Sequence, residues 1–272
     1  ARELEARDPG DFRPLRSGGR SQELQPMIRS IDALFTRLDR LRASERHFIA
    51  SAAHELQTPL AGLRTHAQIA LMADDPVTKE KSLRRIETSV ERTSRLVHQL
   101  LELAREEGTT EPAADSWISL AATIEKTREE LATALERRNV RLACSPAVRN
   151  AAVFMNENGL ALVLRNLIEN ANNHSPDHAT IRIDLQKEGV KVALVIDDEG
   201  PGIPESELER VKERFVRGAR EKGPGSGLGL SIVELVLGHS GAALRLSNRS
   251  VRGLRASIVL PQERIRMPDQ PV

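Results

Sequence analysis

The stretch at residues 50–62, ASAAHELQTPLAG, places an acid–base pair beside a break in helical hydrogen bonding. His54 is followed directly by Glu55 and, four residues after the histidine, by Thr58, so all three fit on one helix. Pro59 comes next. Because proline has no N–H, the carbonyl of Glu55 loses its helical partner and the helix should bend there. A histidine, a carboxylate and a hydroxyl beside a bend predict a reactive site rather than ordinary helix core.

Apolar residues recur at spacings of three and four on both sides of this stretch. The pattern predicts one helix from residue 26 to about residue 72 and a second from about residue 77 to 105, joined by a short turn. The apolar positions around the histidine are Phe48, Ile49, Ala52, Leu56, Leu60 and Leu63. A single antiparallel hairpin cannot cover its own apolar stripe, so we expect a homodimer whose helices form a four-helix bundle.

The phase of this repeat turns the histidine outward. At about 100° per residue, His54 lies roughly 200° from Ala52 and from Leu56, which both belong to the apolar seam. An exposed histidine is ordinarily a solvated one, and we interpret His47, His66 and His98 in that way. His54 differs because an acid, a hydroxyl and a helix bend lie beside it.

The composition excludes several classes of protein. Of the 272 residues 29% are charged, yet the net charge is only +1, without the clustered basic face that nucleic-acid binding requires. The single Cys144 excludes an internal disulfide framework and is typical of a reducing compartment. No apolar run approaches the ~18–20 residues that cross a bilayer. The chain starts without Met or a signal-like segment, so we expect a soluble part of a longer protein.

The pattern changes after residues 108–115, GTTEPAAD, which have the composition of a linker. Helices and short alternating strands follow one another to about residue 260, and they predict a two-layer α/β sandwich with a mostly antiparallel sheet. The expected helices cover residues 120–138, 157–173 and 230–239. The expected strands cover residues 140–144, 151–155, 180–186, 190–196, 243–248 and 254–260. The last residues, from 263 on, are expected to be a frayed tail.

An unusual row of asparagines occurs at residues 164–176, LRNLIENANNHSP. Asn166, Asn170 and Asn173 recur at one helix face, although asparagine is a poor helix former. Their neutral carboxamide oxygens suit a hard cation such as Mg²⁺ that phosphates already partly neutralise. The alternative is a solvated polar face, for which Lys or Glu would serve better.

Two glycine-rich stretches accompany this row. Residues 195–204, VIDDEGPGIP, end a strand in two carboxylates, one of which could accept from an exocyclic amine such as that of adenine. Residues 223–232, GPGSGLGLSI, run into a helix whose bare N–H groups would cradle phosphate. Alone, the first is also a common turn. The second matches neither the Walker spacing nor a Rossmann turn. Together the three stretches predict a nucleotide site.

These motifs resemble those of the sensor histidine kinases of two-component systems. HELQTP resembles their H-box, and LRNLIENANNHSP, DDEGPGIP, ERFVRG and GSGLGLSIV resemble their N, G1, F and G2 boxes, in the same order. The resemblance covers residues 45–262 and implies a dimerisation and histidine-phosphotransfer hairpin at 45–107. It also implies an ATP-binding domain of the gyrase, chaperone and histidine-kinase type at 116–262. Residues 1–44 are similar to part of a HAMP signal-relay module.

The resemblance implies a role for each motif residue. His54 would take the γ-phosphoryl group of ATP, Glu55 would act as general base, and Thr58 would position water for the reverse, phosphatase reaction. Asn166 and Asn170 would hold Mg²⁺. The other residues implied to contact the nucleotide are Asn173, His174, Asp198, Gly200, Gly202, Arg217, Gly225, Gly227, Leu228 and Gly229. Among them Asp198 would bind the adenine amine, and residues from 217 to 227 would form a lid.

Two positions depart from the family pattern. Gln57 stands where Arg or Lys is frequent, which predicts altered partner docking or rates rather than lost activity. Asn173 replaces a usual basic residue, whose charge Arg217, Arg220 or Lys222 would supply from the lid.

The resemblance also implies a response regulator as partner and attachment to the cytoplasmic side of the bacterial inner membrane through segments outside this chain. Two other functions remain open. One is an ATPase of the same nucleotide-binding fold without a phospho-histidine, and the other is an inactive dimeric relay scaffold. His54 in HExxT on a dimerising hairpin argues against the first. The intact asparagine row and glycine loop argue against the second.

Overall fold

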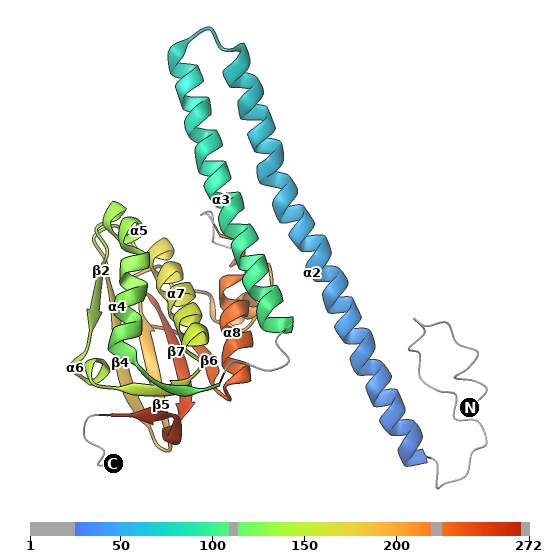
Figure 1. Ribbon diagram of the computed structural model, residues 1–272, viewed down its shortest axis with the longest axis vertical. Helices are drawn as coiled ribbons and strands as arrows, with labels where there is room; N and C mark the ends of the chain where they lie inside the picture. The colour runs from blue at the N-terminus through green and yellow to red at the C-terminus, as the bar shows by residue number, and fades with distance from the viewer. Residues whose placement is uncertain (1–24, 109–113, 219–224, 268–272) are drawn as a thin grey trace. The chain divides into compact units, whose positions relative to one another are not determined.

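The computed structural model (Figure 1) describes residues 25–108, 114–218 and 225–267. The predicted HAMP-like segment therefore lies mostly outside the described residues. The chain divides into two compact units, Ala1–Ala61 and Gly62–Val272. This division falls inside a helix, and not at the expected linker.

The two long helices are present as predicted. Helix α2 covers Gln25–Met72 and continues through Pro59, and helix α3 covers Pro76–Gly108. The start of α3 has a local cause, because the carboxylate of Asp75 accepts the N–H of Val77 at 3.2 Å and that of Thr78 at 3.0 Å. Hydrogen bonds from the side chain and then the backbone of Thr78 hold the pKa of Asp75 below its usual value.

Much of the predicted apolar stripe is open to solvent in the single chain. Leu34, Ile49 and Leu60 on α2 are more than half exposed, and so are Leu83 and Val90 on α3. Large apolar side chains spaced along one helix face and left uncovered indicate a surface that another chain would bury.

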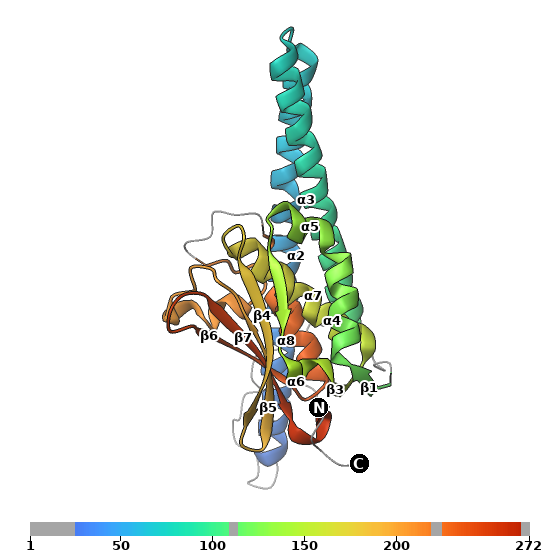
Figure 2. The same ribbon diagram turned by 90° about the vertical axis from the view of Figure 1, so that its left-hand side faces the viewer.

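The second unit contains the predicted two-layer sandwich. Its five-stranded sheet has the order β2-β4-β5-β7-β6, in which β2 runs parallel to β4 and every other pair is antiparallel. These strands cover Arg141–Cys144, Thr180–Glu188, Lys191–Asp197, Leu254–Pro261 and Ala243–Asn248, in sheet order. One face of the sheet is covered by α4 (Leu120–Glu130), α7 (Glu157–His174) and α8 (Gly229–His239), as Figure 2 shows.

The core between these layers is aliphatic. The strands bury Ile183, Leu194 and Ile258, and the helices bury Ile168 and Ile232, each at 1% exposure or less. A chain with only 2% aromatic residues fills its core with Leu, Ile and Val, as the composition predicts. This rigid layer pair fixes the ends of α7, α8 and β5, where the predicted nucleotide residues lie.

One predicted helix and several short elements differ from expectation. The helix predicted at 120–138 is two helices, α4 and α5 (Ala132–Arg137), because the turn is broken at Leu131. The structure adds β1 (Ser116–Ser119) and the short helix α6 (Pro146–Arg149), neither of which carries a periodic signal.

A frayed tail is expected from residue 263, but the ordered structure continues beyond that residue. Residues Ile265–Arg266 form β8, which pairs with β3 (Ala152–Met155) beside β1 in a second, three-stranded sheet. Ile265 is 2% exposed, and Arg264 forms an ion pair with Asp115 at 2.9 Å. A strand of two residues has no alternation that a sequence pattern could reveal.

Candidate nucleotide and phosphoacceptor site

The reactive stretch predicted on α2 lies in the first unit. His54 and Thr58 are exposed and Glu55 is half-buried, so the histidine faces outward as the heptad phase predicts. The Thr58 hydroxyl donates to the His54 carbonyl oxygen at 3.2 Å. Gln57 is exposed beside them. The histidine ring is thus accessible, on a helix, next to a carboxylate.

The asparagine row of α7 is only partly brought together. Asn166 is 5% exposed, and its amide donates to the Leu162 carbonyl at 2.9 Å. Asn170 is half-buried, whereas Asn173 is exposed. The neighbouring Asn172 is the buried one at that turn and donates to the Ala134 carbonyl at 3.4 Å, away from the predicted row.

The start of α8 meets the deepest asparagine. A Cβ built on Gly229 would lie 3.1 Å from the Asn166 Oδ1 atom, so this carboxamide oxygen faces the first turn of α8. The helix begins at Gly229 and leaves its first N–H groups free of helical partners. A helix N-terminus beside an amide oxygen suits phosphate together with a cation.

Asp197, the last residue of β5, and Asp198, which follows it, have different environments. Asp197 forms a bidentate ion pair with Arg255, with both N–O distances at 2.7 Å. Asp198 is instead 5% exposed, and its Oδ1 accepts the N–H of Gly200 at 2.8 Å and that of Leu254 at 2.9 Å. In the part of the chain that the structure describes, Oδ2 of Asp198 makes no hydrogen bond. This oxygen is available to accept a hydrogen bond from a ligand.

Burial raises the pKa of the Asp198 carboxyl. The hydrogen bonds from Leu254 and Gly200 act in the opposite direction and lower this pKa, as does the positive charge of Arg249. A buried carboxylate with an unused oxygen is typical of a binding site rather than of a folding element.

The loop that follows Asp198 packs tightly against neighbouring segments at Gly200 and Gly202. A Cβ on Gly200 would lie 2.9 Å from the His174 carbonyl oxygen at the end of α7, and one on Gly202 would lie 2.5 Å from Asn248 Oδ1. No side chain larger than glycine fits at either position without movement. His174, half-buried, thus lies against this loop as well.

The described part of the glycine loop, residues 225–229, packs against the main chain of Phe215. Gly227 has φ +71°, and a Cβ there would lie 2.8 Å from the main-chain carbonyl carbon of Phe215. The Phe215 N–H donates to the Gly227 carbonyl at 2.9 Å, and the side chain of Leu228 is fully buried. Gly225 has open space around it. Arg217 is half-buried, while Arg220 and Lys222 lie outside the described residues.

Sequence reasoning missed the turn between β6 and β7. The Asn248 amide accepts the Ile203 N–H at 2.9 Å and donates to the Ile203 carbonyl at 2.7 Å. A Cβ on Gly253, whose φ is +114°, would lie 2.0 Å from the Asp198 carbonyl oxygen. The stretch NRSVRG reads only as a hairpin turn, because these contacts join residues about fifty positions apart.

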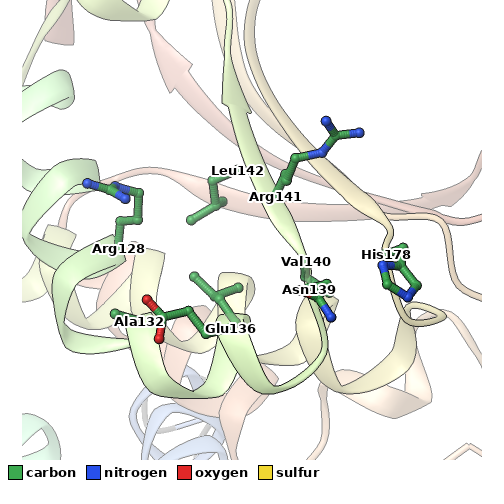
Figure 3. Close-up of a pocket in the computed structure, with 9 residues that line it drawn as sticks. Arg128, Ala132, Glu136, Asn139, Val140, Arg141, Leu142 and His178 are labelled. Atoms are coloured by element: carbon green, nitrogen blue, oxygen red, sulfur yellow. The ribbon is translucent and has the colours of Figure 1, made fainter.

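A separate cavity of about 600 Å³ contains none of the predicted site residues. It is lined by Arg128, Ala132, Leu135, Glu136, Asn139, Val140, Arg141, Leu142 and His178. Figure 3 shows that Arg128 on α4 and Arg141 on β2 point away from each other. Because its charged groups do not converge, we assign no ligand to this cavity.

The described residues contain neither a ready-made metal site nor a membrane-spanning helix. No group of three His, Cys, Asp or Glu side chains in residues 25–108, 114–218 and 225–267 is arranged to hold a metal ion by itself. Over the same residues no helix is both long and apolar enough to span a bilayer. The carboxamides of Asn166 and Asn170 remain suitable for a cation that shares its shell with phosphates.

Comparison with known proteins matches two separate stretches of the chain. Residues 44–109 match the family described as His Kinase A (phospho-acceptor) domain. Residues 155–264 match the family described as Histidine kinase-, DNA gyrase B-, and HSP90-like ATPase. The first match contains His54, and the second contains the asparagine row, Asp198 and the glycine loop.

Whole-chain relatives are sensor proteins. Sensor protein BasS of Salmonella typhimurium strain LT2 is 34% identical over 263 residues, which are 95% of this chain and 71% of that protein. Sensor protein QseC of Escherichia coli O157:H7 is 29% identical over 256 residues, and the chain spans 56% of its length. The solved structure of histidine kinase ThkA in complex with response regulator protein TrrA is similar in fold. It has a TM-score of 0.65 at 22% identity, over 83% of this chain and 64% of that chain. The chain belongs to the bacterial sensor histidine kinases.

Proposed function

We propose that the chain is an ATP-dependent protein-histidine autokinase whose phosphoacceptor is His54. The observation that carries the proposal is the exposed His54 beside a half-buried Glu55, in a chain whose residues 155–264 match an ATPase family. A ring nitrogen of His54 attacks the γ-phosphorus of ATP, the bond to the bridging oxygen breaks, and ADP leaves with the electron pair. Glu55 holds the proton on the other ring nitrogen, which keeps the attacking lone pair free.

In the second unit, the free Oδ2 of Asp198 would accept a hydrogen bond from the adenine amine, and the carboxamides of Asn166 and Asn170 would hold the Mg²⁺ ion. Mg²⁺, when bound, would neutralise phosphate charge. The N–H groups at Gly229 and in the loop around Gly227 donate to phosphate oxygens. Catalysis of this kind consists mostly of positioning and charge neutralisation.

The phosphoryl group then passes from His54 to an aspartate of a response regulator. The relatives named sensor proteins, and the kinase whose solved structure contains a response regulator, support this partner. Thr58 would position water for the reverse, phosphatase reaction. The protein would act as a homodimer through the exposed apolar stripe of α2 and α3. Attachment at the cytoplasmic side of the inner membrane belongs to the same proposal for the longer protein.

The test is incubation with γ-³²P-ATP and Mg²⁺, followed by acid and base treatment of the labelled protein. We expect an acid-labile, base-stable label that disappears in His54→Ala. The matched control is His47→Ala, an exposed histidine on the same helix, which should keep the label. Steady ATP hydrolysis without label would instead support the ATPase alternative. Absence of both nucleotide turnover and label would support the relay scaffold.

A further inference from the structure

The turn between β6 and β7 is closed by Arg249. Its main-chain N–H donates to the Gly253 carbonyl at 2.9 Å, and its Nη1 donates to the Arg252 carbonyl at 3.2 Å. The side chain is 21% exposed, so most of it is packed against the protein.

The same guanidinium reaches both aspartates at the end of β5. Nη1 of Arg249 donates to the Asp198 carbonyl oxygen at 2.5 Å, and Nε lies 3.6 Å from Oδ2 of Asp197. Within the described residues, the guanidinium of Arg255 bonds Asp197 and not Asp198. Among the arginines of the described chain, Arg249 is thus the one whose side chain bonds Asp198.

This contact has a consequence for the Asp198 side chain. One of the two N–H groups that occupy Oδ1 belongs to Leu254, the first residue after the turn. Gly253, just before it, packs so closely on the Asp198 carbonyl that no Cβ fits. Because the turn fixes both the main chain and Oδ1 of Asp198, it also fixes the direction of Oδ2, the oxygen left for a ligand.

We propose that Arg249 is a positioning residue for base recognition, which holds Asp198 so that its free oxygen meets the exocyclic amine of the nucleotide. The inference rests on the proposed nucleotide function and deepens it. Arg249 does not touch the nucleotide in this arrangement. The positive charge of Arg249 also favours the ionised form of the buried Asp198 carboxyl, which accepts the hydrogen bond from the amine.

The test compares ATP with purine riboside 5′-triphosphate, which lacks the 6-amino group, by calorimetric binding with Mg²⁺. We expect the unaltered chain to bind ATP with an affinity about tenfold or more above that of the analogue, because only ATP can donate a hydrogen bond to the charged Asp198 acceptor. Arg249→Met should weaken ATP binding by about tenfold while changing binding of the amine-free analogue by less than about twofold. Arg249→Lys keeps the charge and one donor, and should restore part of the preference.

The matched control is Arg245→Met on β6, whose ion pair with Glu188 at 2.9 Å is exposed. It should leave the preference for ATP unchanged. Thermal unfolding shows whether Arg249→Met folds. If it does not fold, the test relies on Arg249→Lys alone. In that case, an ATP preference in Arg249→Lys as strong as in the unaltered chain would overturn the inference.

Other outcomes separate this inference from the proposed function. Equal weakening of both nucleotides by Arg249→Met would leave Arg249 a purely structural brace and overturn the inference. Equal binding of both nucleotides by the unaltered chain would overturn it as well, with the kinase proposal intact. Binding of neither nucleotide by the unaltered chain would overturn both.

Discussion

At the scale of single residues, the two adjacent aspartates should respond in opposite ways to loss of charge. Burial raises the pKa of the Asp198 carboxyl, so ionising it costs the folded state free energy above that pKa. The penalty is fully present above the folded-state pKa and vanishes once the pH falls below the pKa of the unfolded chain. Asp198→Asn should therefore raise the thermal unfolding midpoint at pH 7 by a few degrees, and this gain should shrink toward acid pH.

Asp197→Asn is the matched control. It weakens the bidentate ion pair with the partly exposed Arg255 and should lower the free energy of unfolding by about 1 kcal/mol. Nucleotide binding should be lost in Asp198→Asn and largely kept in Asp197→Asn. Scanning calorimetry at several pH values checks the first expectation, and a lower midpoint for Asp198→Asn at pH 7 would contradict it.

Site residues could be predicted from the sequence where they lie together in one short motif. The asparagine row, Asp198 and the glycines lie inside contiguous motifs, so the resemblance located them. Helical phase alone could not show that Asn172 is buried and Asn173 exposed, because that depends on how α5 packs. Arg249 acts on a residue 51 positions away, and no local pattern reports such a contact.

At the scale of elements, the glycine loop should tolerate a methyl group at one glycine and not at another. Gly227→Ala forces a side chain into a positive φ and against the Phe215 main chain, at a cost of about 1–2 kcal/mol or more. We expect ATP affinity to fall by about tenfold or more as the loop shifts. Gly225→Ala, in open space, should change it little.

Binding of adenosine provides the internal control for this loop. Adenosine engages Asp198 without phosphates, so its affinity should be nearly equal in both glycine variants. Loss of adenosine binding in Gly227→Ala would mean that the base pocket had also collapsed, and would count against a role confined to phosphates.

The short strand β8 should matter to stability despite its length. Ile265 is 2% exposed against β3, so Ile265→Ala should lower the free energy of unfolding by about 2–4 kcal/mol. Val251→Ala, at a side chain 93% exposed in the β6–β7 turn, should have no measurable effect. Urea denaturation of both variants makes the comparison. Equal stability of the two would restore the original prediction of a frayed tail from residue 263.

At the scale of the whole molecule, periodicity predicted the long helices and the sandwich because each repeats its apolar pattern over many residues. The aliphatic core and the mostly antiparallel sheet followed from the same signal. The three-stranded sheet did not, since β1 and β8 have only four and two residues, and each of them is defined by its tertiary pairing with β3. Where a structure depends on distant segments meeting, a single sequence contains no local trace of it.

The exposed apolar stripe leads to the last prediction. Leu83 and Val90 lie two helical turns apart on α3, and both are about half exposed in the single chain. In a monomer these apolar side chains stay in water and contribute no hydrophobic stabilisation, whereas a four-helix bundle would bury them. The double variant Leu83→Lys with Val90→Lys should therefore convert a dimer to a monomer in analytical ultracentrifugation at micromolar concentration. Arg85→Glu, at an exposed charge about 200° around the same helix from Leu83, should leave the dimer intact, and a monomeric unaltered chain would refute the bundle.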